Sequence, residues 1–174
     1  SSTHFHKLAG IEGADSVAVS AHKLLMQPKD SALVMFRDPE LANSAISFGG
    51  GYLTTPNIGV QGSRGAAAIS LLATLLALGR AGIAERIDRV MEMANQLAEK
   101  LRADENIELL AMPKTGVTVF RPRNFDTDGI HAKLPSGMFS TCVIEDERWL
   151  RSVAANPLAD IDLIVTTIKE AVRG

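Results

Sequence analysis

The 174-residue chain has little of several features that mark common protein classes. It contains one cysteine, Cys142, so an internal disulfide framework is excluded, and a reducing compartment, by default the cytoplasm, is expected. Its 18 basic and 20 acidic residues give a formal net charge of -2 and form no block of one sign. This balance argues against nucleic acid or an acidic membrane surface as a partner.

Long hydrophobic runs are also missing. The longest strongly apolar stretch, 65–78, carries Ser70 and Thr74 and is shorter than the roughly 20 residues that a membrane-spanning helix needs, so we expect a buried helix. The chain opens without an initiator Met and without a basic region followed by an apolar run, so we expect no secretory signal and a start in mid-protein. A hydrophobic content of 46% is enough for a real core.

The pattern of apolar and turn-forming residues predicts two parts, residues 1–81 and residues 82–174. In the first part we expect strands at 16–20 and 31–37, a helical turn at 39–45 capped by Asp38, a Gly-rich loop at 47–65 and a nearly all-apolar, buried helix at 65–78. In the second part we expect an amphipathic helix at 83–102, strands at 107–112, 117–121, 138–144 and 149–155, and a terminal helix at 161–172. The fold class is therefore α/β, with a smaller α+β part in which helices cover an antiparallel sheet.

The dipeptide His22-Lys23 carries the most chemical information. It follows the first apolar strand and precedes a segment, 24–27, that we expect to be extended and that Pro28 closes, so Lys23 is predicted at a strand end facing a cleft. In a partly dry pocket the ε-amine loses its proton more readily than in water and can condense with an aldehyde. That is the requirement of a pyridoxal 5'-phosphate (PLP) Schiff base. By residue type alone, Lys23 would be a solvated surface charge.

Other candidate motifs have simpler explanations. His4 and His6 could bind a metal, but no third ligand of suitable type lies nearby in the sequence, so no metal site is expected. Gly49 to Gly51 could cradle a phosphate, but no strand leads into them and no P-loop lysine follows. Tyr52, the only tyrosine, is explained equally well by packing and by chemistry.

Two segments resemble a known family. The segment from His6 to Lys23 closely resembles the PLP-lysine region of group II amino acid decarboxylases, which include glutamate, aromatic amino acid and 2,4-diaminobutyrate decarboxylases. The segment 149–164 looks like the family's final strand, with an Asn-Pro and an Asp-rich entry to the last helix. The resemblance implies the C-terminal portion of a fold type I PLP-dependent enzyme. Residues 1–81 would end its large PLP-binding α/β domain, and residues 82–174 would form its small α+β domain.

The resemblance also implies roles for individual residues. Lys23 would be the Schiff-base lysine, and His22 and Ser20 match positions that reach the PLP phosphate, although the family often has Asn in place of Ser20. Arg151 matches the arginine that pairs with the substrate α-carboxylate, for which a planar guanidinium is well suited. Arg151 and the loop 52–64 would orient the scissile bond. Without the resemblance, Arg151 is equally a surface charge or part of a structural ion pair.

The implied activity is decarboxylation of an L-amino acid, in which PLP takes up the electrons left by the departing carboxylate. The segment from Leu24 to Pro28 favours the 2,4-diaminobutyrate and glutamate branch. The resemblance implies a homodimer and a missing N-terminal part of the same enzyme as partners, and we expect residues 1–174 alone to be inactive.

Two alternatives stay open at this point. Another fold type I PLP enzyme, cysteine desulfurase-like or aminotransferase-like, would also place His-Lys after a strand. A non-catalytic interaction domain could retain the scaffold without binding PLP.

Overall fold

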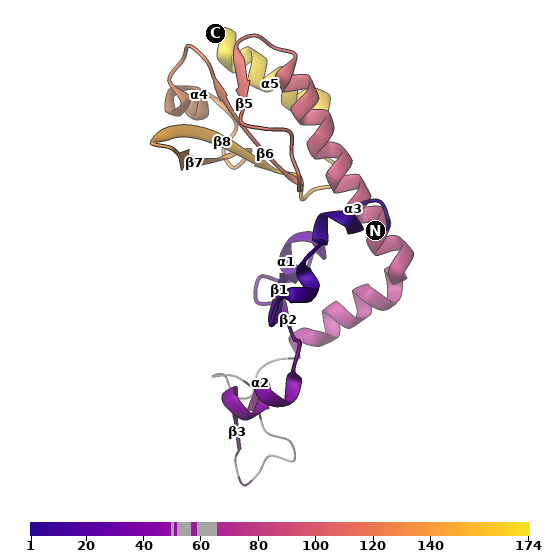
Figure 1. Cartoon of the computed structure of the whole chain (residues 1–174). Helices are drawn as coiled ribbons and strands as arrows, with labels where there is room; N and C mark the ends of the chain where they lie inside the picture. The colour runs from indigo at the N-terminus through magenta and orange to yellow at the C-terminus, as the bar shows by residue number, and fades with distance from the viewer. Residues whose placement is uncertain (50, 52–56, 59–65) are drawn as a thin grey trace. The chain divides into compact units, whose positions relative to one another are not determined.

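The structure is a computed structural model that describes residues 1–49, 51, 57–58 and 66–174 (Figure 1). The chain forms two compact units, Ser1–Ala84 and Glu85–Gly174. This division lies close to the boundary expected after residue 81.

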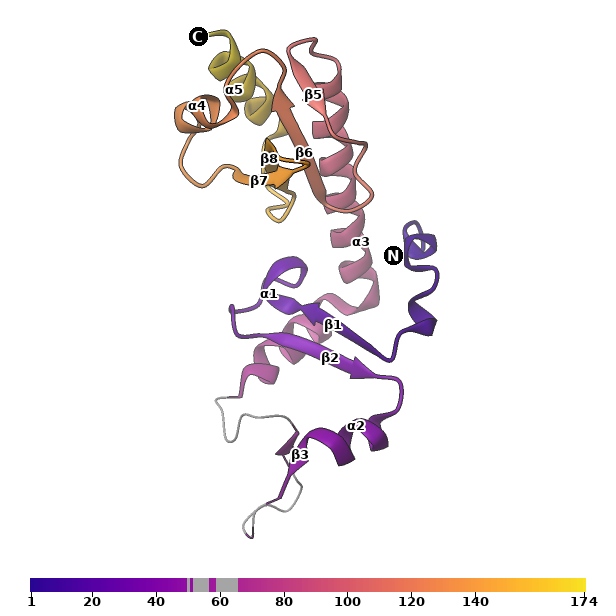
Figure 2. The ribbon, with the colours of Figure 1, turned by 60° about the vertical axis from the view of Figure 1, so that its left-hand side comes forward.

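The N-terminal unit is built on a two-stranded antiparallel sheet (Figure 2). Its elements are the 3-10 helices Phe5–Leu8 and Ile11–Gly13, β1 (Ser16–Ser20), α1 (Ala21–Leu24), β2 (Ala32–Phe36), α2 (Pro39–Ile46), β3 (Ser47–Phe48), β4 (Asn57–Ile58) and the first half of α3 (Ala67–Arg102). β1 pairs with β2 along its whole length, from Ser16 opposite Phe36 to Ser20 opposite Ala32. Both strands lie within the ranges that their apolar runs predict, 16–20 and 31–37.

Helix α2 begins as its sequence predicts. The Oδ1 of Asp38 accepts a hydrogen bond from the N–H of Leu41 at 2.9 Å, and Pro39 occupies the first helical position. The expected loop at 47–65 contains one short antiparallel pair, β3 with β4. Tyr52 and the rest of the expected loop, 50, 53–56 and 59–65, lie outside the described residues.

Helix α3 consists of two helical segments, in agreement with the two helices that the sequence predicts. It runs from Ala67 to Arg102, but Gly79 has a non-helical backbone with φ 58° and ψ −173°. Such a conformation is essentially restricted to glycine, because a Cβ would crowd the backbone. The break at Gly79 therefore separates an apolar segment from the amphipathic segment of the second unit.

By length and composition alone, α3 is long and apolar enough to cross a membrane. The break at Gly79 limits the straight apolar part to residues 67–78, which span about 18 Å at 1.5 Å per residue. A bilayer hydrocarbon core is about 30 Å thick, so this part is too short to cross it.

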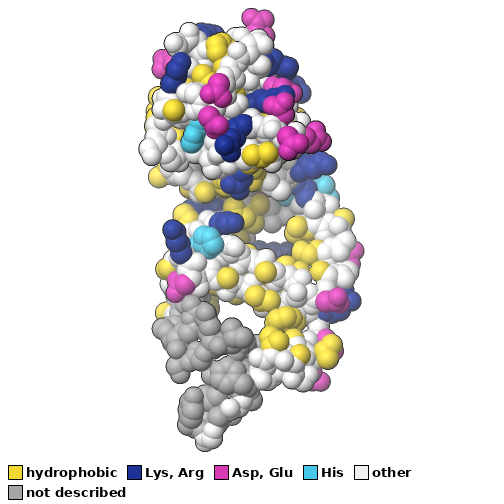
Figure 3. Space-filling view, turned by 90° about the vertical axis from the view of Figure 1, so that its left-hand side faces the viewer, with side chains coloured by type: hydrophobic (Ala, Val, Ile, Leu, Met, Phe, Trp, Pro, Cys, Tyr) yellow, Lys and Arg dark blue, Asp and Glu magenta, His cyan; other side chains and the backbone are white. Residues whose placement is uncertain are grey.

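The prediction that the helix at 65–78 is buried is wrong for the described residues. Leu71 is 5% exposed, whereas Ile69 and Leu76 are 66% and 75% exposed. Leu71 and Thr74 contribute the stripe of this helix that faces its own unit, and a two-stranded sheet is too small to cover the rest. On β2, Met35 is 51% exposed. Exposed apolar side chains appear as yellow patches in Figure 3.

The C-terminal unit is a four-stranded antiparallel sheet with the strand order β5-β6-β8-β7. After the second half of α3 come β5 (Ile107–Leu109), β6 (Val117–Pro122), α4 (Thr127–Lys133), β7 (Ser140–Ile144), β8 (Glu147–Val153) and α5 (Ile161–Arg173). The sequence predicts each of these strands and α5. It does not predict α4, a two-turn helix that Asp126 caps by accepting from the N–H groups of Asp128 and Gly129.

The core of the C-terminal unit lies between the sheet and its helices. α3 and α5 lie along the sheet in both ribbon views (Figures 1 and 2). The core contains Leu97, Leu101, Ile107, Phe120, Ile130, Leu134, Phe139, Leu150, Val165, Ile168 and Val172. Phe120 and Phe139 meet edge to face, with ring centroids 5.5 Å apart. This packed layer holds β8, the strand that carries Arg151, in a fixed register.

Candidate functional site

Lys23 lies in α1, within residues 21–27, which begin the connection from β1 to β2 and are called the lysine turn. The N–H of the fully buried Ala21 donates to the carbonyl of Ser31 at 3.1 Å. The carbonyl of Ala21 accepts from the N–H groups of Leu25 and Gln27, each at 3.2 Å. These hydrogen bonds close the segment after the strand into a loop, and Lys23 lies on the outer side of this loop.

The expected extended segment at 24–27 is wrong at its start. Leu24 is the last residue of α1, and Met26 has a positive φ of 51°. The cause is the carbonyl of Ala21, which takes two N–H donors and so curls the chain instead of letting it continue straight. Met26 then reverses the direction of the chain.

The described residues also do not form the dry pocket that was predicted around Lys23. The Lys23 side chain is exposed. Ala21 occupies the buried side of the one-turn helix. Lys23 follows two positions later, about 200° around the helix at 100° per residue, and so points outward.

Three predicted site residues come together at this turn. Ser20 ends β1 and is exposed, His22 is partly buried, and Lys23 follows it directly. The Nδ1 of His22 is buried and has no hydrogen-bond partner among the described residues. A buried nitrogen of this kind is costly unless a further group pairs with it.

This set of groups fits PLP. The accessible amine of Lys23 can bind an aldehyde, while the Nδ1 of His22 and the hydroxyl of Ser20 are suited to phosphate oxygens. The unpartnered His22 nitrogen is the observation of this structure that supports the fit.

Arg151 belongs to the other unit, on β8. It is partly exposed, and its Nη1 donates to the Oγ of Ser140 at 3.5 Å. Within the described part of the chain, no carboxylate pairs with it. The structural ion pair that the sequence left open for Arg151 is therefore not formed by these residues.

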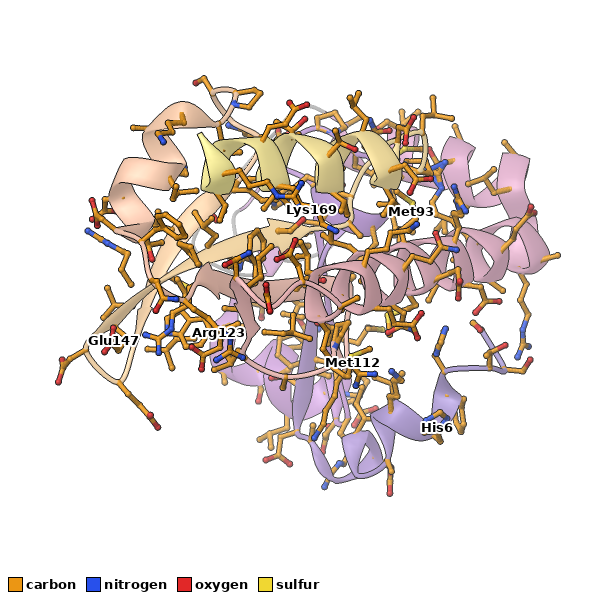
Figure 4. All side chains as sticks on the ribbon, turned by 90° about the horizontal axis from the view of Figure 1, so that it is seen from above. His6, Met93, Met112, Arg123, Glu147 and Lys169 are labelled. Atoms are coloured by element: carbon orange, nitrogen blue, oxygen red, sulfur yellow. The ribbon has the colours of Figure 1, made fainter. Side chains whose placement is uncertain are left out.

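Arg121 on the neighbouring strand shows the contrast. Its guanidinium is 2.9 Å from Glu108 and 2.8 Å from Glu147, and it lies over the Trp149 ring at 4.5 Å. Glu147 is labelled in Figure 4. The pKa of Arg121 is raised, first by its hydrogen bond to Glu108 and then by the charges of both carboxylates. Arg121 is therefore held in a structural ion-pair cluster, whereas Arg151 pairs with no carboxylate among the described residues.

Sequence reasoning missed Gln27. It is 9% exposed, and its amide nitrogen donates to the carbonyl of Leu25 and to the Oγ1 of Thr74. The available signal was one amide residue in an otherwise apolar stretch directly after Lys23.

The chain is similar to curated proteins that are named as decarboxylases. The aspartate 1-decarboxylase of Aliivibrio fischeri is 32% identical over 127 residues, which are 70% of this chain and 23% of that protein. The L-2,4-diaminobutyrate decarboxylase of Rhizobium meliloti is 28% identical, over 69% of this chain and 26% of that protein.

Among solved structures, the Oryza sativa TDC with PLP and tryptamine matches 99% of this chain with a TM-score of 0.82 at 20% identity. This match shows the fold, that of fold type I PLP-dependent enzymes, as the sequence predicts. The chain covers 41% of that structure and thus spans less than half of it.

The lysine turn lies inside the segment that the family model matches. The family model described as "Pyridoxal-dependent decarboxylase conserved domain" matches residues 1–123, more than half of the chain, including β1, α1 and β2. The chain therefore belongs to the pyridoxal-dependent decarboxylase family, as its resemblance to group II decarboxylases implied.

Proposed function

We propose that the protein containing this chain is a PLP-dependent carboxy-lyase that removes the α-carboxylate of an L-amino acid as carbon dioxide. The observation that carries the proposal is the accessible amine of Lys23 beside the buried, unpartnered Nδ1 of His22, within the segment that matches the decarboxylase family.

Each candidate residue has a role in this proposal. The amine of Lys23 holds the cofactor covalently, and His22 and Ser20 bind its phosphate. When bound, PLP supplies an electron sink for the pair left by the departing carboxylate. Arg151 binds and orients the substrate α-carboxylate through its planar guanidinium. Because Lys23 is exposed on the described residues, we propose that other parts of the full-length protein, in a homodimer, enclose it.

For the substrate we propose an amino acid of the 2,4-diaminobutyrate or glutamate type. The support is the Leu24 to Pro28 segment and the names of two relatives, which act on aspartate and on 2,4-diaminobutyrate. A short polar side chain is common to all three substrates. We propose the cytoplasm as the location, on the single cysteine alone.

The experiment is a substrate panel on the full-length protein, scored by carbon dioxide release. The panel contains 2,4-diaminobutyrate, glutamate, aspartate and tryptophan. We expect release from one of the first three, and a loss of at least about 1,000-fold on Lys23→Ala. The matched control is Lys29→Ala, which changes an exposed lysine of the same connection and should keep activity.

Other products would contradict the proposal. A keto acid or sulfane sulfur without carbon dioxide indicates an aminotransferase-like or a desulfurase-like enzyme. Full activity of Lys23→Ala would remove the lysine from the mechanism.

A further inference from the structure

Gln27 is a buried polar residue placed four positions after Lys23. It is 9% exposed, and its neighbours Met26 and Pro28 are both exposed. Burial of an amide costs free energy unless its polar atoms are hydrogen-bonded, so the burial of Gln27 in an exposed turn requires an explanation. The reason lies in the contacts of its side chain.

Both protons of the Gln27 amide nitrogen are used, whereas its Oε1 is buried and has no hydrogen-bond partner among the described residues. Nε2 donates to the carbonyl of Leu25 at 2.8 Å and to the Oγ1 of Thr74 at 2.8 Å. The hydroxyl of Thr74 donates its own proton to the carbonyl of Ser70 at 3.0 Å, so it can only accept from Gln27. The site therefore requires an NH2 group and cannot be served by a carboxylate.

These contacts tie the lysine turn to α3. The backbone N–H of Gln27 donates to the carbonyl of Ala21, and its side chain holds Leu25, so Lys23 lies inside the loop that Gln27 closes. Through Thr74 the same side chain connects this loop to a helix 47 residues away in the sequence. Gln27 thus fixes the shape of the turn and also its place on α3.

We propose that Gln27 is a positioning residue for Lys23: its amide bridge from Leu25 to Thr74 holds the lysine turn against α3, so that the amine stays where the cofactor binds. The inference rests on the proposed function, because it gives the amide bridge of Gln27 a role in cofactor binding. The alternative is a residue that only contributes to stability.

Three variants of the full-length protein separate these possibilities. Gln27→Glu keeps the size of the side chain but places a carboxylate, without a proton to donate, against two oxygens. Thr74→Val keeps the shape of the helix residue but removes the acceptor. Thr74→Ser is the matched control, because it keeps the hydroxyl and should rescue whatever Thr74→Val loses.

Two readouts are needed. The first is hydrogen exchange of the backbone amides of Leu25 and Gln27 in the cofactor-free protein, which should be at least about 10-fold faster in Gln27→Glu and Thr74→Val. The second is the rate at which added PLP forms a borohydride-trappable adduct at Lys23, which should fall about 10-fold in both variants and return in Thr74→Ser. Circular dichroism identifies any variant that fails to fold, in which case the other one decides.

The outcomes are distinct. If adduct formation is as fast in Gln27→Glu and Thr74→Val as in the wild type, with only the unfolding midpoint lowered, Gln27 is structural and the inference is overturned. If the wild type itself forms no adduct at Lys23, the proposed function fails, and the cofactor role of Gln27 fails with it.

Discussion

At the scale of single residues, Asp104 shows how one carboxylate stabilises the C-terminal unit. Its Oδ1 accepts from the backbone N–H of Asn106 at 3.0 Å, and its Oδ2 lies 3.6 Å from the Nζ of Lys169, which Figure 4 labels on α5. The pKa of Asp104 is lowered, first by the hydrogen bond from the Asn106 backbone and further by the charge of Lys169. The ionised form is therefore favoured in the folded state.

This pKa shift predicts a loss of stability in acid. Because the pKa is lower in the folded state, the stabilisation is complete above the ordinary pKa of Asp and is lost as the pH falls from about 4 through the folded pKa. Asp104→Asn keeps an oxygen for Asn106 but lacks the charge, so it should be less stable at pH 7 by about 1 kcal/mol. Urea unfolding at pH 7 and pH 2.5 should show this gap closing in acid. A gap that stays equally wide at pH 2.5 contradicts the assignment.

The grouping of the candidate site residues was predictable where the signal is local. Ser20, His22 and Lys23 lie within four consecutive residues, and the strand that Ser20 ends was predicted from its apolar run. The hydrogen bond of Gln27 to Thr74 was not predictable, because the two residues are 47 positions apart and only the folded backbone brings them together. The exposure of Lys23 was missed as well, since the direction of a side chain depends on the single helical turn of α1.

At the scale of elements, the break in α3 predicts the sign of a change in the free energy of unfolding. Gly79 has φ 58° and ψ −173°, and a Cβ added there would meet no atom within 4 Å. Gly79→Ala should therefore destabilise the protein through its backbone alone, by about 1–3 kcal/mol. In an uninterrupted helix the same change would stabilise by about 1 kcal/mol. The free energy of unfolding in urea distinguishes the two, and an increase contradicts the break.

Element types followed from the sequence better than their pairing. The strands and α5 of the C-terminal unit come from period-two and period-3.6 patterns, which are local. The position of β8 between β6 and β7 is a long-range property that these patterns do not contain. α1 and α4 are too short for a periodic signal, and the turn at Glu145 and Asp146 has positive φ angles without a glycine to announce it.

At the scale of the whole molecule, the described residues leave Lys23 without an enclosing pocket. Lys23 is exposed on the described residues, and the aligned part of the chain makes up 23% and 26% of its two reported relatives. We predict that a protein limited to residues 1–174 releases no carbon dioxide from the substrate panel, whereas the full-length protein does. Turnover by residues 1–174 alone would refute this prediction.

The family could be predicted from the sequence, since it depends on segments with strong local patterns. The exposure of the first half of α3 could not be predicted. An apolar composition favours a buried helix, but it does not tell whether residues of the same chain bury it. Ile69 and Leu76 remain exposed for that reason.

The central claim is that Lys23 is the residue that holds the cofactor. Borohydride reduction of the full-length protein with PLP, followed by peptide mass mapping, tests it most directly. The account predicts one pyridoxyl group on Lys23, which disappears in Lys23→Ala and persists in Lys29→Ala. A label on another lysine, or none at all in the folded protein, would contradict it.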